Sequence, residues 1–123
     1  MIFLTNSTDL LQIVLDGAVT TNELDWVATF HKHVAGEPEI KEDVTNGGNS
    51  NGTTDVTVVA GPVEATYVHV GIAELHIYNK DTVAAVVTVK LDRNGTEYIL
   101  HKDSLAAGEE LQYNDGSGFV HGA

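Results

Sequence analysis

The segment that decides the fold is Leu24-Asp25-Trp26-Val27-Ala28-Thr29-Phe30-His31-Lys32-His33. Its side chains alternate with a period of two. One face carries the apolar residues Leu24, Trp26, Ala28 and Phe30. The other face carries Asp25, Val27, Thr29, His31 and His33. This alternation is typical of a half-buried β-strand and does not fit the spacing of an amphipathic helix.

The segment Ala65 to Asn79 changes its pattern part-way along. Val68, Val70 and Ile72 share one parity, whereas Leu75 and Ile77 share the other. A regular strand would turn one of these two sets toward the wrong face of its sheet. We therefore predict a β-bulge or bend near Gly71 to Glu74, where one extra residue resets the register.

Asn94-Gly95 is the strongest hairpin signal in the chain, because both residues tolerate the positive φ of a type I′ turn. A two-residue loop predicts three facing pairs: Leu91 with Tyr98, Val89 with Leu100, and Asp92 with Glu97. The first two pairs agree in polarity, which supports this register. The third pair brings two acidic side chains together, so a bulged variant of the hairpin stays open.

These patterns predict an all-β protein, an antiparallel β-sandwich of jelly-roll or immunoglobulin-like type with an extended N-terminal arm. Residues 1–45 are expected to form the arm, whose strands pack on the sandwich or on a neighbouring subunit. Residues 46–55 have the sequence NGGNSNGTTD, which predicts a flexible loop. Residues 56–123 are expected to form the sandwich itself.

The chain of 123 residues has 18 acidic and 6 basic side chains, a net charge of −12. Nucleic-acid binding needs clustered Lys and Arg, so this balance argues against it and against binding to anionic membranes. No apolar run approaches the roughly 20 residues that span a bilayer. The chain has no cysteine, which excludes disulfides and thiolate metal sites. The acidity is explained either by solubility or by binding to a basic partner.

Motifs for catalysis or cofactor binding are weak. His31 and His33 share a strand face and are weak candidates for metal binding, because a site needs at least a third ligand. No serine lies in a Gly-x-Ser-x-Gly motif, and no glycine-rich stretch has the form of a phosphate loop. We therefore expect no enzyme activity, no catalytic residue and no cofactor.

Aromatic residues allow one further interpretation, a platform that binds carbohydrate. Its candidate members are Trp26, Tyr67, Tyr78, Tyr98 and Tyr113. In β-domains such residues more often belong to the core and its edges. A carbohydrate-binding adhesion module is therefore an alternative function.

Several segments resemble small structural proteins of tailed bacteriophages. They are Leu11 to Asn22, Leu75 to Thr82, Val86 to Leu91, Gly95 to Leu100 and Leu105 to Tyr113. The resemblance implies a virion component, most specifically a capsid decoration or cement protein that binds and stabilises the assembled head. A neck, tail or fibre module is the structural alternative.

The resemblance also implies partners and a location. The partners would be the major capsid protein or other virion proteins, and the location would be the virion, after synthesis in the host cytoplasm. A homo-oligomer is expected, and a trimer would suit a three-fold position on a capsid. The predicted packing and contact residues are Leu10, Leu11, Ile13, Trp26, Phe30 and His33.

Overall fold

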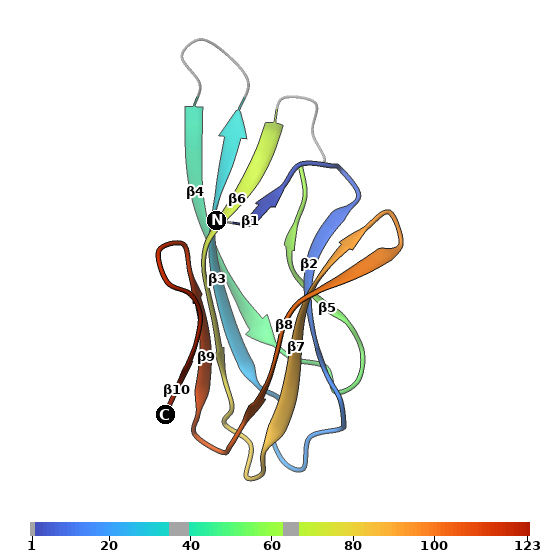
Figure 1. The fold of residues 1–123 in the computed structure, drawn as a ribbon, viewed down its shortest axis with the longest axis vertical. Coiled ribbons are helices and arrows are strands. Elements are labelled where there is room, and N and C mark those ends of the chain that lie inside the picture. The colour runs from blue at the N-terminus through green and yellow to red at the C-terminus, as the bar shows by residue number, and fades with distance from the viewer. Residues whose placement is uncertain (1, 35–39, 63–66) are drawn as a thin grey trace.

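The computed structural model describes residues 2–34, 40–62 and 67–123, and this part of the chain is all-β and contains no helix. Its strands form two antiparallel sheets that pack face to face (Figure 1). The prediction of an antiparallel β-sandwich is confirmed. Since no helix is present in these ranges, none of them crosses a membrane as a helix.

The larger sheet has six strands, in the spatial order β10 (Gly118–Gly122), β9 (Glu110–Asn114), β6 (Tyr67–Tyr78), β3 (Asp25–Val34) and β4 (Ile40–Asn49), with β1 (Ile2–Leu4) also paired to β6. The smaller sheet has the order β5 (Val56–Ala60), β2 (Asp9–Leu15), β7 (Ala85–Arg93) and β8 (Thr96–Leu105).

The core lies between the sheets and is built from alternate residues of their central strands. Both sheets contribute buried side chains to one cluster, among them Leu11, Ile13, Trp26, Phe30, Ile72, Ile77, Val87 and Val89. The period-two pattern therefore predicted correctly which side chains of β3, β6 and β7 are buried. Burial of such apolar surface stabilises the fold by about 25 cal/mol per Å².

The predicted bulge in the segment Gly71 to Glu74 is confirmed. On β3, Thr29 lies opposite Glu74, but the next residue, Phe30, lies opposite Ile72. Ala73 is the extra residue on β6. It allows Ile72 and Leu75 to face the core together, although they have opposite parity in the sequence.

The β7–β8 hairpin follows the prediction at its tip only. Asn94 and Gly95 have φ values of 53° and 86°, and Leu91 lies opposite Tyr98. The predicted pairing of Val89 with Leu100 is wrong, because the register shifts and Val89 lies opposite His101. The shift lets Leu100 pack against the core while Ile99 stays outside.

The N-terminal segment is not the arm that we predicted. β2 lies inside the smaller sheet, between β5 and β7, and β3 lies between β6 and β4. The described parts of residues 1–45 therefore supply central strands to both sheets. The expected boundary fails because the apolar rows of β2 and β3 form part of the shared core.

The predicted loop at residues 46–55 is partly a strand and is anchored. β4 continues to Asn49, and Ser50 is buried. The carboxylate of Glu23 accepts hydrogen bonds from the Ser50 hydroxyl at 2.6 Å and from the Gly52 amide at 3.0 Å. The Ser50 hydroxyl in turn accepts one from the Leu24 amide at 2.9 Å.

An ion pair with a buried carboxylate joins the start of β2 to the end of β7. Asp9 is fully buried and accepts hydrogen bonds from Arg93 Nε and Nη2, both at 2.8 Å. It also accepts bonds from the Thr5 and Asn6 amides at 2.9 and 3.0 Å. The Arg93 bonds outweigh the effect of burial and, with the backbone bonds, lower the pKa of Asp9 to about 2.

We predict that Asp9→Asn lowers the free energy of unfolding by about 2 kcal/mol at pH 7. The pKa of Asp9 is lower in the folded than in the unfolded chain. Its contribution is therefore complete above about pH 4 and is lost as the pH falls toward 2. Urea unfolding at pH 7 and pH 3 measures both effects.

Asp16→Asn is the matched control, because Asp16 is exposed and lies 3.1 Å from Lys102, which is also half-exposed. This change should alter stability by about 0.5 kcal/mol or less. Equal effects of the two substitutions at pH 7 would contradict the role given to Asp9.

Candidate interaction surface

The six predicted contact residues do not form one surface. Four of them are buried between the sheets: Leu11, Ile13, Trp26 and Phe30. Leu10 is partly exposed on the smaller sheet, and His33 is partly exposed on the larger one. The prediction of surface contacts is therefore wrong for the four buried residues, because the apolar side chains of β2 and β3 face the core.

The predicted aromatic platform is also not assembled. Trp26 and Tyr113 are buried, and the Tyr67 side chain lies outside the described residues. Tyr78 and Tyr98 are exposed, but they belong to β6 and β8, which lie in different sheets. The described members of the predicted platform therefore share no surface on which a sugar ring would stack.

His31 and His33 lie on the outer face of the larger sheet, opposite Asp43 and Lys41 of β4. His31 Nδ1 is 2.5 Å from Asp43 Oδ1, and the His33 ring stacks on His69 with the ring centroids 4.0 Å apart. Within the described ranges, no group of three or more His, Asp or Glu side chains is arranged to hold a metal ion.

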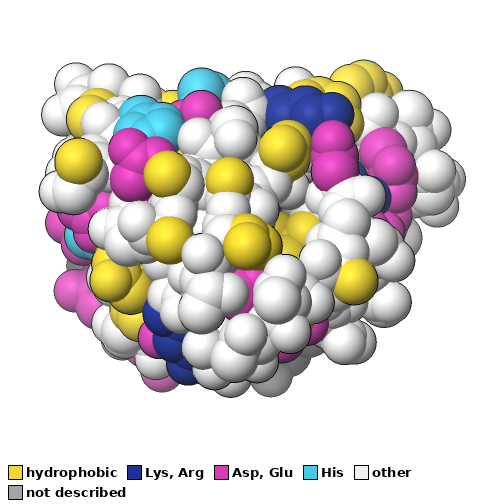
Figure 2. Space-filling view, turned by 90° about the horizontal axis from the view of Figure 1, so that it is seen from below, with side chains coloured by type: hydrophobic (Ala, Val, Ile, Leu, Met, Phe, Trp, Pro, Cys, Tyr) yellow, Lys and Arg dark blue, Asp and Glu magenta, His cyan; other side chains and the backbone are white. Residues whose placement is uncertain are grey.

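The lower end of the molecule carries a small hollow of about 170 Å³ between Ala18, Val19 and Ala85. Seen from this end, hydrophobic side chains form small patches separated by polar surface (Figure 2). Asp81 borders the hollow and accepts hydrogen bonds from the Thr20 and Thr21 amides, both at 2.8 Å. These bonds outweigh burial and lower the pKa of Asp81 to about 2, so this carboxylate anchors a loop.

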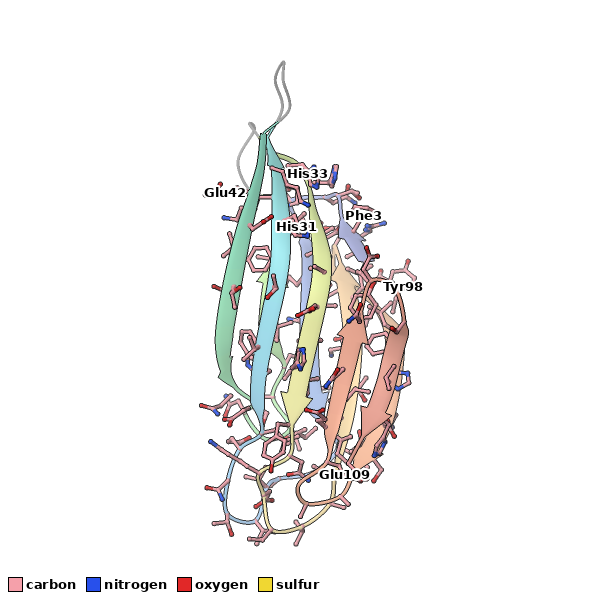
Figure 3. The ribbon with its side chains drawn as sticks, turned by 90° about the vertical axis from the view of Figure 1, so that its left-hand side faces the viewer. Phe3, His31, His33, Glu42, Tyr98 and Glu109 are labelled. Atoms are coloured by element: carbon pink, nitrogen blue, oxygen red, sulfur yellow. The ribbon has the colours of Figure 1, made fainter. Side chains whose placement is uncertain are left out.

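The outer face of the larger sheet, which we call the broad face, gathers most of the exposed apolar side chains. Seven large hydrophobic residues are exposed in the described ranges, and four of them lie on this face: Phe3, Val27, Tyr78 and Val120. They come from β1, β3, β6 and β10. Figure 3 looks onto this face and shows Phe3, His31 and His33 toward its upper end.

The lower half of the broad face is a row of side chains that crosses the sheet. Val27 of β3 lies opposite Gly47 of β4 and His76 of β6. The row continues through Gln112 of β9 to Val120 of β10. Glycine next to Val27 adds no side chain over it, and the Val27 side chain is 45% exposed.

The upper half of the broad face is an aromatic cluster. The Phe3 ring meets His69 edge to face with centroids 5.2 Å apart, and His69 stacks on His33. The three rings come from β1, β6 and β3. Such rings combine a large apolar area with little conformational freedom, a property that favours protein contacts.

Acidic side chains on the broad face have partners. Asp25 forms an ion pair with Lys80 at 2.8 Å, and Asp43 is bonded to His31. Glu110 accepts a hydrogen bond from Gln112 at 2.5 Å. The net charge of −12 therefore does not make this face a simple acidic surface.

No family model, curated protein or solved structure matches this chain. The sequence indicated Val27 as an outward residue of its strand, and it also placed His31 and His33 there. Phe3 and Val120 were not identified, because their strands are too short to show a clear alternation.

We predict that Trp26→Ala and Val27→Ala differ sharply in stability, although the residues are neighbours in the chain. Trp26 is 7% exposed and Val27 is 45% exposed. Loss of the Trp26 ring leaves a cavity and should cost about 3–5 kcal/mol. Loss of the Val27 methyl groups should cost about 1 kcal/mol or less. Thermal unfolding of both variants measures the difference, and similar losses would contradict the assignment of the two faces.

Proposed function

We propose that the protein is a non-catalytic structural component of a tailed-bacteriophage virion, a decoration or cement protein that binds the assembled capsid through the broad face. The observation that carries this proposal is the gathering of exposed apolar side chains on that one face. The segments that resemble phage structural proteins give the partner class, the major capsid protein.

The geometry of the broad face supports binding to an extended partner. A sheet face with an open row of side chains meets another protein over an area, whereas a cleft would suit a small molecule. Exposed Phe and Tyr side chains are typical anchors of protein interfaces. On a capsid, many weakly bound copies would together stabilise the shell.

The charge arrangement supports the same proposal. Asp25 and Asp43 of the broad face are paired within the protein, so binding does not leave these two carboxylates buried without a partner. We expect capsid binding to depend only weakly on salt, because its main contribution is apolar.

A neck, tail or fibre module is the structural alternative, and copy number separates it from a decoration protein. We expect quantitative mass spectrometry of purified virions to find about one copy of the protein for each major capsid protein subunit that surrounds a binding position. A trimer at each three-fold position is the expected arrangement. A dozen copies or fewer per particle would favour the neck or tail. Absence from the virion would overturn the proposal.

The decisive binding experiment compares Val27→Asp with Val83→Asp. Both valines are 45% exposed, but Val83 lies in the turn between β6 and β7, away from the broad face. We expect Val27→Asp to weaken binding to capsids that lack the protein by ten-fold or more, which is about 1.4 kcal/mol. Val83→Asp should bind like the unmodified protein.

Val27→Asp should unfold at a slightly lower temperature than Val83→Asp, because aspartate is disfavoured in a strand, and both variants should be folded in the binding assay. Equal capsid affinity of the two variants would reject the broad face as the binding site. Loss of binding by Val83→Asp alone would place the contact at the lower end of the molecule.

A further inference from the structure

The edges of the two sheets meet on one side of the sandwich, where β10 of the larger sheet faces β8 of the smaller one. β10 pairs with β9 and forms the edge of its sheet. Its Phe119 ring stacks on His101 of β8 with the centroids 4.6 Å apart. Contacts between side chains therefore close this seam, since no backbone ladder joins the two strands.

His121 of β10 lies at this seam between two carboxylates. Its Nδ1 is 2.8 Å from Asp103 Oδ2 on β8, and its Nε2 is 3.0 Å from Glu109 Oε2 in the turn before β9. An ionised carboxylate only accepts hydrogen bonds, so both contacts are hydrogen bonds only when both ring nitrogens carry a proton. The doubly protonated imidazolium therefore fits this site, and the neutral ring loses one of the bonds.

We propose that His121, Asp103 and Glu109 form a proton-controlled latch that fastens β10 to β8 and to the β8–β9 turn. Below the titration range of His121 both bonds are made and the C-terminal strand is held. Above it one bond is lost and the strand is held by its ladder to β9 and by Phe119. β10 carries Val120, so an effect of the latch on capsid binding rests on the function proposed above.

The charged surroundings of His121 support this direction. β8 presents Asp103 and His101, and the turn presents Glu109. Two of these three groups are acids, which favour the charged ring. The bonds to Glu109 and Asp103 raise the pKa of His121 above 6.5. The stabilisation that the latch gives is thus complete below about pH 6.5, and it is lost as the pH rises through the pKa that His121 has in the folded chain.

The first test is hydrogen exchange of the β10 amides at pH 6.0 and 8.5, corrected for the intrinsic pH dependence, on the protein without capsids. We expect protection in the unmodified protein to fall about three-fold at the higher pH, a size suited to one exposed charged bond. His121→Gln should show weak protection at both values. His76→Gln is the control, because His76 lies 3.8 Å from its nearest carboxylate, on the broad face.

The second test is an NMR titration of the unmodified protein, which does not depend on a variant that folds. It should place the pKa of His121 above 6.5. A pKa of 6.5 or less, or equal protection of β10 at both pH values, would overturn the latch. So would an unchanged pH dependence in His121→Gln. None of these measurements involves the capsid, so the latch and the proposed function fail separately.

Discussion

The structure depends on one constraint: each central strand must turn one row of apolar side chains inward, and two sheets must cover those rows together. β2 and β3 show this most clearly, because each lies in the middle of its sheet and gives its apolar parity to the shared core. The side chains of β3 that point the other way, Val27 among them, then lie on the surface. The broad face is thus a direct result of the way in which the core is built.

Carboxylates in and next to the turns fix segments of the chain in addition to the apolar core. Asp9 fixes the start of β2 to Arg93, Glu23 holds the turn after β4, and Asp81 binds the amides of Thr20 to Asn22. Each accepts hydrogen bonds from backbone amides of a neighbouring loop or turn. Part of the acidity of the chain is therefore structural.

The sequence predicted the fold class, the buried parity and the bulge in β6, because each follows from a short-range pattern. It did not predict that β2 would pair with β5 and β7, since strand order depends on contacts between distant segments. For the same reason Ser50 and Gly52 were predicted as residues of a flexible loop, although both donate hydrogen bonds to the Glu23 carboxylate. The surface was predicted least well: Trp26 and Phe30 were predicted as contact residues, but they lie in the core.

The bulge on β8 has a consequence for neighbouring molecules. This strand is the edge of its sheet, so a strand of another molecule could pair with its outer backbone groups. It also exposes the apolar side chains of Tyr98 and Ile99, which favour such pairing. Displacement of Leu100 interrupts the regular spacing of backbone donors and acceptors along that edge. This irregularity hinders edge-to-edge pairing between crowded copies, the route by which exposed edge strands join into a continuous sheet.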